Sequence, residues 1–345
     1  MKSPFICLFT CFFILMAPAQ KKSISLDQIW DGSFRTQEMI ALHSMNNGQQ
    51  YSVLNFDRSS RSTSIDLYDY KTLSKVKTIA TSQMMDAIPY FTNYTFSDDE
   101  RQVLLETETE PIFRYSLLGL YYVYNIRSES LEKVSDYKIQ EPAFSPDGTK
   151  VAYGRNNNIF IKDLISGTTK QITFDGEKNK IINGITDWVY EEEFAFVRAF
   201  EWNASSNKIA FIRFDETDVP EFSMDIYGTE LYQTQEVFKY PKAGETNAEV
   251  SLHFYDLSTE DISSIPLSKD YNDFYIPRIK WTKDPDVLSA QYMNRHQNTL
   301  DLWLINPTTT QSDLVLTDKD DAYVDVTDNL TFLKDNSFIW TSEKD

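Results

Sequence analysis

The sequence predicts an all-β fold and, within that class, a β-propeller. Its 345 residues contain no long segment with the 3.6-residue apolar period of an amphipathic helix. Short alternating runs rich in Tyr, Phe, Val and Ile recur instead, and polar turns separate them. Four such runs per unit, at a period of about 45–50 residues, are typical of propeller blades. The turns that mark successive units occur at Ser97, Ser145, Asn203, Thr282 and Leu333, which are 48, 58, 79 and 51 residues apart.

Residues 142–173 form the clearest unit. A Ser-Pro-Asp-Gly turn at 145–148 joins the first strand to a second at 151–153. An Asn-rich turn then leads into a third strand at 159–161, and a Ser-Gly turn leads into a fourth. We therefore expect four short antiparallel strands here. A β-sandwich is the alternative architecture, but the fivefold return of the turn motif favours the propeller.

The same order of strands recurs on both sides of this unit. An earlier unit pairs residues 51–56 with 65–70 across a turn at 57–64. The other units are 94–99 leading into 102–105 and 121–126, 200–203 into 208–213 and 252–257, 279–282 into 287–292 and 300–305, and 330–333 into 337–341.

Two spacings are long enough to require insertions, which in propellers lie on loops at one face and often form the binding surface. The larger insertion, residues 215–248, is the better candidate for an arm that binds a partner, including a second copy of the chain. The repeat pattern continues up to residue 345, which falls inside a blade. An open terminal blade exposes a strand edge and half a core, so we expect the propeller to be truncated before ring closure.

The first nineteen residues have the pattern of a secretory signal peptide. Lys2 precedes an apolar run at 5–16, and Ala17-Pro18-Ala19 follows as a cleavage site. The run is shorter than the roughly 20 residues of a membrane span, so we expect no stable span. The prediction is a signal peptide at 1–19 cleaved near Ala19, a lead-in segment at 20–40, and the incomplete propeller at 41–345. The protein would then be exported, to the periplasm or the extracellular space.

The charge and composition exclude several classes of function. A net charge of -19 argues against nucleic acid and anionic membranes as partners. Three His, two Cys and the absence of phosphate-loop glycine motifs predict neither a metal nor another cofactor. The acid-rich segment 318–328 lacks the loop Gly and the spacing of a calcium site, so a solvated loop is favoured there. A cationic or amine-bearing ligand fits the sign of the charge better.

The most unusual segment is NGITDWVYEEEF at residues 183–194, with three consecutive carboxylates at Glu191, Glu192 and Glu193. A solvated acidic run is one interpretation, but the aromatic flanks indicate partial desolvation. In a helical turn, adjacent side chains diverge by about 100°, so at most two of the three converge on one point. Two converging carboxylates require a metal, an Arg or an ammonium group. A peptide α-amino group is mostly protonated near neutral pH, so such a site would suit an exopeptidase.

This segment resembles the glutamate motif of dipeptidyl peptidase IV and its relatives in the prolyl oligopeptidase family of serine peptidases. Segments 214–220, 240–244 and 292–298 are also similar, and the resemblance covers essentially the whole mature chain. It implies an eight-bladed propeller, about five and a half blades of which lie in this chain, followed by an α/β-hydrolase domain. It also implies the release of N-terminal dipeptides with a penultimate Pro or Ala, from peptide substrates with a free N-terminus.

The resemblance assigns roles to individual residues. Glu192 and Glu193 would bind the substrate ammonium group, and Arg114, in the segment 110–116, would hold a substrate carbonyl. The alternative interpretation is that Arg114 is a surface cation with no role in binding. The remaining motif residues would support the conformation of the motif: Asp187, Trp188, Tyr190 and Glu191.

The sequence departs from the family in the residues that cleave the bond. It contains no G-x-S-x-G elbow for a nucleophilic serine. His43, His253 and His296 have no Ser/Asp partner pattern, and we expect each to be structural. No catalytic residue is therefore assigned, and the chain alone is predicted to be inactive without the missing α/β-hydrolase domain. The alternative function is a non-catalytic propeller that binds peptides or partner proteins.

Overall fold

The computed structural model describes residues 23–36, 41–266 and 271–343. The chain divides into two units, residues 1–41 and 42–345. In the first unit a short helix, α1 (Leu26–Trp30), begins at a capping box in which Ser25 and Gln28 exchange hydrogen bonds. The predicted signal peptide and its cleavage site at Ala19 lie outside the described residues. Within the described ranges, no helix has both the length and the apolar character needed to cross a membrane.

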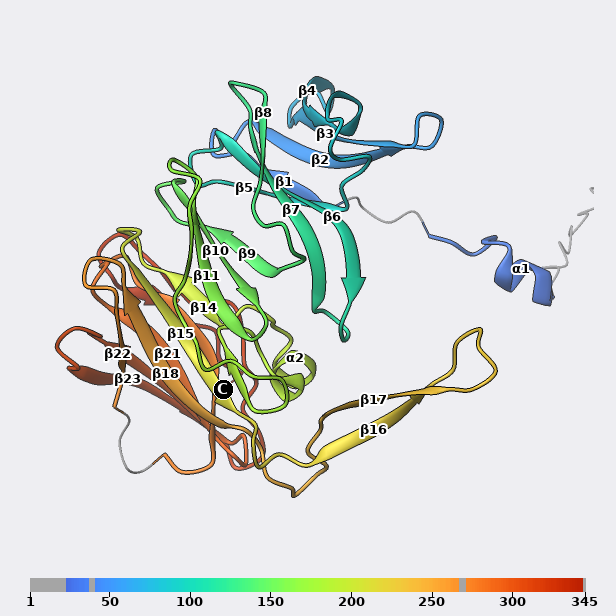
Figure 1. Ribbon diagram of the computed structural model, residues 1–345. Helices are drawn as coiled ribbons and strands as arrows, with labels where there is room; N and C mark the ends of the chain where they lie inside the picture. Colours follow the sequence, from blue (N-terminus) through green and yellow to red (C-terminus); the bar gives the residue numbers. More distant parts are fainter. Residues whose placement is uncertain (1–22, 37–40, 267–270, 344–345) are drawn as a thin grey trace, which may run out of the picture. The chain divides into compact units, whose positions relative to one another are not determined.

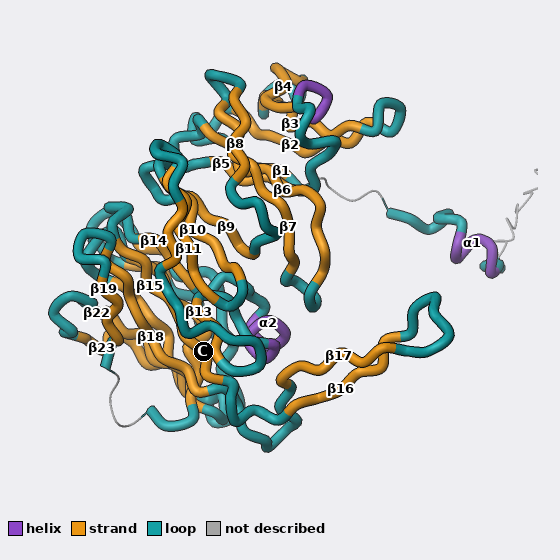
Figure 2. Tube along the Cα trace, viewed as in Figure 1, coloured by secondary structure: helices purple, strands orange, loops and turns teal. Residues whose placement is uncertain are grey.

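The second unit is built almost entirely from antiparallel sheets (Figures 1 and 2). In the described part of the chain, five sheets have four or five strands each, and a two-stranded sheet follows them. The first sheet contains β1 (Leu42–Ser44), β2 (Gln50–Asp57), β3 (Ser62–Asp69) and β4 (Lys75–Thr81), and a 3-10 turn, η1 (Ser82–Met84), follows it. The second contains β5 (Asn93–Phe96), β6 (Gln102–Pro111), β7 (Leu117–Asn125) and β8 (Ser130–Lys133). The third contains β9 (Gln140–Phe144), β10 (Lys150–Arg155), β11 (Asn158–Asp163) and β12 (Thr169–Gln171).

The fourth sheet carries both insertions. Its strands are β13 (Ile181–Asn183), β14 (Phe200–Trp202), β15 (Lys208–Asp215), β18 (Glu249–Asp256) and β19 (Asp261–Ser264). Along the chain, helix α2 (Trp188–Phe194) follows β13 and precedes β14. A separate hairpin of β16 (Glu221–Ile226) and β17 (Thr234–Lys239) is inserted in the chain after β15 and before β18. We call this hairpin the arm. The fifth sheet contains β20 (Phe274–Trp281), β21 (Leu288–Asn294), β22 (Thr299–Ile305) and β23 (Ser312–Lys319), and the last contains β24 (Thr331–Phe332) and β25 (Phe338–Ile339).

Successive sheets pack face to face, as the period-2 alternation of their strands requires. On β6, Val103 and Leu105 lie in a core shared with the first sheet, while Leu104 lies in a core shared with the third. On β10, Ala152 faces the fourth sheet, while Val151 faces the second. The second and third sheets therefore bury both faces against their neighbours in sequence. The predicted all-β class and the blade repeat of about five and a half units are confirmed.

The predicted turns also link one blade to the next. Each turn joins two consecutive strands of its sheet, and a hydrogen bond connects it to the equivalent turn of the next blade, up to the last turn at 333–336. The polar residues of the turns thus hold neighbouring blades together. The links are Asn46 Nδ2 to Asp98 O (2.8 Å), Gln102 Nε2 to Gly148 O (2.9 Å), Asp147 N to Ser206 Oγ (3.0 Å), Asn203 Nδ2 to Pro285 O (3.1 Å) and Lys283 N to Asn336 Oδ1 (3.0 Å).

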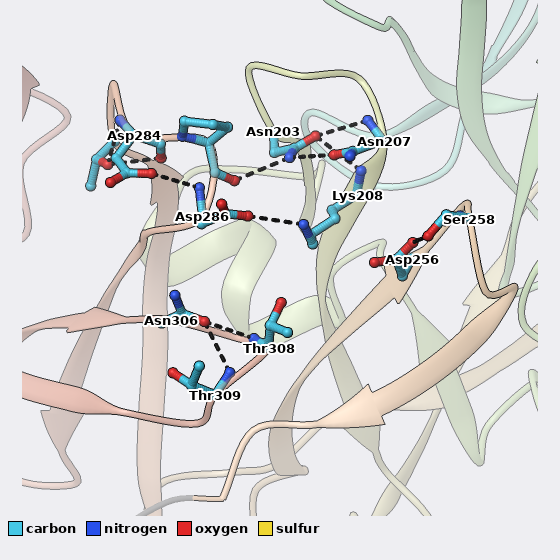
Figure 3. A network of polar contacts seen from close by, with 12 residues as sticks. Asn203, Asn207, Lys208, Asp256, Ser258, Asp284, Asp286, Asn306, Thr308 and Thr309 are labelled. Carbon is cyan, nitrogen blue, oxygen red and sulfur yellow. Dashed lines mark hydrogen bonds and ion pairs between the residues drawn. The ribbon is translucent and has the colours of Figure 1, made fainter.

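Figure 3 shows this link between the fourth and fifth sheets. The side-chain oxygen of Asn203 accepts hydrogen bonds from the backbone N–H groups of Asn207 (3.0 Å) and Lys208 (2.9 Å), which closes its own turn. The buried Lys208 side chain then pairs with Asp286 at 3.0 Å, across the blade boundary. A single amide side chain therefore both shapes one turn and joins it to the next blade.

Two expectations about strand length were wrong. The turn predicted at 57–64 spans fewer residues, because β3 already begins at Ser62, where Ser62 and Thr63 are buried in the sheet. The strand predicted at 102–105 continues to Pro111, because the polar residues of that stretch still pair with β7. The longer β6–β7 hairpin places Arg114 at its tip.

Candidate functional site

Helix α2 carries the acidic motif and begins at Asp187. The Asp187 carboxylate accepts a hydrogen bond from the Tyr190 backbone N–H at 2.9 Å, which satisfies one of the free donors at the helix start. The Tyr190 ring is buried against Phe214 and Tyr275, and its hydroxyl accepts a hydrogen bond from the Ile276 N–H at 2.8 Å. Burial raises the pKa of Tyr190, so the phenol stays neutral. Both residues hold the helix in place.

The end of the helix is fixed by the fifth sheet. Arg278 on β20 donates a hydrogen bond from Nη2 to the Phe194 carbonyl at 2.8 Å. Its guanidinium also lies 4.8 Å from the centre of the Phe196 ring. Ala195 adopts the left-handed conformation, with φ 55°, and ends the helix. The seven-residue helix is thus held at both ends and along one face.

Glu191 is buried and points away from the two carboxylates that follow it. Its side chain is 1% exposed, and one oxygen accepts hydrogen bonds from the backbone N–H groups of Tyr115 (2.6 Å) and Ser116 (2.8 Å). These two donors belong to the tip of the β6–β7 hairpin. Glu191 therefore anchors the backbone that immediately follows Arg114, a connection between the helix and the second blade.

Glu192 also connects helix α2 to the β6–β7 hairpin, because it pairs with Arg114. Arg114 Nε lies 2.6 Å from Glu192 Oε2, although the two residues are 78 positions apart in the sequence. The Glu192 side chain is 15% exposed, whereas that of Arg114 is 65% exposed. The hydrogen bond and charge of Glu192 raise the pKa of Arg114, which remains a cation. The structure thus brings together two of the three residues expected to bind substrate.

Glu193 faces the same cavity as Glu192 and Arg114. This cavity has a volume of about 950 Å³. Within the described residues, the exposed Glu193 carboxylate makes no hydrogen bond or ion pair, so its charge is available to a cation. The other Arg side chain at the cavity, Arg295, is already paired with Asp273 at 3.2 Å. The site therefore combines one neutralised carboxylate with one free carboxylate.

The arm forms an aromatic wall of this cavity. Phe222 and Phe238 are paired across β16 and β17, with ring centres 6.0 Å apart, and both line the cavity. Tyr240, just beyond β17, packs on Trp188 of helix α2 with ring centres 4.2 Å apart. The cavity is consequently lined by α2, the β6–β7 hairpin and the arm, together with residues near β20 and β21. It offers a cation site next to an apolar surface, which suits a ligand with an ammonium group and an apolar body.

A second cavity of about 500 Å³ lies beside the first and contains Glu191, Asp187 and Glu216. Burial raises the pKa of Asp187 to about 6. Burial, and then the charge of Asp187, raise the pKa of Glu216 to about 7. In the described part of the chain, the Glu216 side chain makes no hydrogen bond or ion pair. The structure therefore keeps a titratable carboxyl at the base of the arm.

The three histidines do not line the first cavity, although Arg295 and Gln297, on either side of His296, do. His253 Nε2 is 2.8 Å from Ser251 Oγ on the same strand, but neither residue lines that cavity. His43 lies in β1 against Phe96, and His296 lies in the turn between β21 and β22. Over the ranges that the structure describes, no three His, Cys, Asp or Glu side chains gather as metal ligands, including at residues 318–328.

The sequence did not single out Phe113, Phe238 or Glu216. Phe238, near the end of β17, and Tyr240, just beyond it, alternate in a segment outside any blade, and this pattern was a usable signal for an aromatic wall. Glu216 lies in segment 214–220, which carries part of the resemblance, but its burial depends on elements that are distant in sequence. The sequence of the β6–β7 hairpin tip likewise indicates only an ordinary polar turn.

Blades that pack in sequence, with an acidic helix and an arm inserted in the fourth, define a propeller domain with a cavity lined by both insertions. The chain belongs to the family described as the dipeptidyl peptidase IV (DPP IV) N-terminal region, whose model matches residues 97–345.

Relatives and solved structures agree with this assignment. The structure of dipeptidyl peptidase 4 from Porphyromonas gingivalis matches with a TM-score of 0.87 and 36% identity, over 94% of this chain and 46% of that one. Human prolyl endopeptidase FAP is 30% identical over 80% of this chain and 36% of its own length. A probable dipeptidyl-aminopeptidase B from Talaromyces stipitatus is 30% identical over 69% of this chain and 29% of its own length. The chain thus spans about a third of the length of these two relatives.

Proposed function

We propose that this domain recognises the free N-terminus of peptide substrates for an exported serine peptidase that releases dipeptides. The observation that carries the proposal is the convergence of Glu192, Glu193 and Arg114 on one cavity. Glu193, together with Glu192, binds the substrate ammonium group, and Arg114 binds a substrate carbonyl. The names of the relatives, which are dipeptidyl peptidases and a prolyl endopeptidase, support the substrate class.

The electrostatics favour an ammonium ligand. A carboxylate and an ammonium 4 Å apart attract by about 4 kcal/mol at an effective dielectric of 20, before desolvation is subtracted. Arg114 already offsets the charge of Glu192, so one added cation leaves the three groups and the ligand close to neutral. The guanidinium keeps further N–H donors beside the one that bonds Glu192. An acetylated N-terminus lacks the charge and leaves Glu193 uncompensated.

Calorimetric titration of the 345-residue protein with Gly-Pro-amide and with N-acetyl-Gly-Pro-amide tests this proposal. We expect the free amine to bind at least about tenfold more tightly, which corresponds to about 1.4 kcal/mol. Glu193→Gln removes this preference. Glu230→Gln, which removes a charge from the exposed tip of the arm, is the matched control and keeps it. Equal affinity for the two ligands would show that the cavity does not recognise the N-terminus.

The remaining parts of the proposal concern the whole protein. An α/β-hydrolase domain supplies the nucleophile, and a signal peptide directs export. Mass spectrometry of the protein secreted by its natural host tests the second point, with a mature N-terminus at Gln20 as the expected result. A non-catalytic peptide-binding propeller predicts the same binding but no cleavage of a Gly-Pro-arylamide by the natural full-length protein.

A further inference from the structure

The tip of the β6–β7 hairpin is held on both sides of Arg114. On one side, Glu191 binds the N–H groups of Tyr115 and Ser116. On the other side, the Phe113 ring packs against Phe238 of the arm, with ring centres 5.5 Å apart. The loop is also closed on itself, because Phe113 N donates to Ser116 Oγ at 3.2 Å. Arg114 thus sits between an ionic anchor on α2 and an aromatic anchor on the arm.

The aromatic anchor is itself supported by further contacts within the arm and with α2. Phe238 lies opposite Phe222 in the β16–β17 register and contacts Tyr240 edge-on at 6.1 Å. Tyr240 in turn packs on Trp188 at the start of α2. The base of the arm is fixed by Lys239, whose ammonium group donates to the carbonyls of Thr217 (3.1 Å) and Val219 (2.8 Å). A continuous set of ring contacts therefore runs from α2 through the arm to Phe113.

Arg114 needs such support, because its own side chain is poorly held. It is 65% exposed, and an exposed ion pair gains little net free energy from fixing two flexible side chains. Its orientation must come from the backbone that carries it. Glu191 fixes the residues after Arg114 to helix α2, and the Phe113–Phe238 contact fixes the residue before it to the arm.

We propose that Phe238 is a positioning residue: by packing on Phe113, the arm holds the hairpin tip so that Arg114 stays beside Glu192 in the cavity. This inference rests on the proposed function, in which Arg114 is a ligand of the peptide. It assigns the arm a role in the peptide site of its own chain.

The test compares affinities for Gly-Pro-amide among variants of the 345-residue protein. Phe238→Ala weakens binding by about two- to tenfold, the factor expected for the loss of one aromatic pair. Phe113→Ala has the same effect, and Phe238→Tyr, which keeps the ring, restores wild-type affinity. Val237→Ala, on the same strand but with its side chain on the opposite face, is the matched control and leaves affinity unchanged.

Because Phe238 also lines the cavity, a direct contact with the ligand must be separated from positioning. In an Arg114→Ala background, positioning predicts that Phe238→Ala has no further effect. A loss that persists undiminished in that background would overturn the inference, and so would wild-type affinity in Phe238→Ala.

Amide hydrogen exchange provides a readout without ligand. The N–H groups of Tyr115 and Ser116 exchange faster in Phe238→Ala than in Val237→Ala if the arm holds the hairpin tip, and equal rates would overturn the inference. Failure of the proposed function has a different signature: Arg114→Ala then binds Gly-Pro-amide as the wild type does, and the exchange rates alone decide the positioning role.

Discussion

Replacing Glu191 by Ala removes the anchor between α2 and the β6–β7 hairpin. The carboxylate is 1% exposed and accepts two backbone hydrogen bonds, at 2.6 and 2.8 Å. Ser116 is 4% exposed, so its N–H would be left buried without a partner, at a cost of about 1–3 kcal/mol. Tyr115 is exposed, and water can satisfy its N–H, so its loss adds about 1 kcal/mol. The expected decrease in the free energy of unfolding is about 2–4 kcal/mol.

Urea denaturation measures this decrease in the free energy of unfolding. Two further variants serve as comparisons that separate the loss of the hydrogen bonds from other effects. Both hydrogen bonds use the same oxygen, so the amide of Glu191→Gln can still accept them, and it costs only about 1 kcal/mol through the lost charge. Glu193→Ala removes the exposed neighbour and stays within about 0.5 kcal/mol of the wild type. If Glu191→Ala unfolds with the same free energy as Glu193→Ala, the reasoning about the anchor is refuted.

Three further predictions concern other parts of the second unit. The pKa of Glu216 is raised from 4.5 to about 7, so its ionisation opposes folding and stability falls as the pH rises through this range. Glu216→Gln should therefore raise the free energy of unfolding at pH 8 by up to about 3 kcal/mol and change it little at pH 4.5; the same shift at both pH values would contradict this. Tyr190→Phe leaves the Ile276 N–H without its acceptor and should cost about 1–3 kcal/mol in urea denaturation, whereas Tyr240→Phe, the control, costs less than about 0.5 kcal/mol. We also propose that the arm mediates a homodimer through its apolar tip, where Leu231 is 89% and Tyr232 is 78% exposed. Analytical ultracentrifugation should show a wild-type dimer and a monomeric Leu231→Ser/Tyr232→Ser variant; a wild-type monomer would disprove the role.

The extent of the arm and of the β6–β7 hairpin shows where sequence reasoning loses accuracy. The insertion at 215–248 was evident because it breaks the repeat, and it forms the β16–β17 hairpin. The extension of β6 to Pro111 was missed, because alternating polar residues at an exposed hairpin tip carry no apolar signal. Strand pairing with β7, rather than side-chain burial, keeps that stretch extended.

By itself, the sequence determined the blade repeat, the turns and the acidic motif, because periodicity, turn chemistry and a short helix depend on neighbours within a few positions. It also limited convergence to two of the three carboxylates, since adjacent side chains on a helix diverge. The resemblance pointed to Glu192 and Glu193, and the tertiary structure shows that these two line the cavity while Glu191 binds the β6–β7 hairpin. The pairing of Arg114 with Glu192 and the packing of Phe113 on Phe238 join residues 78 and 125 positions apart. Such contacts depend on how the blades pack on one another, and no local pattern in the sequence predicts that packing.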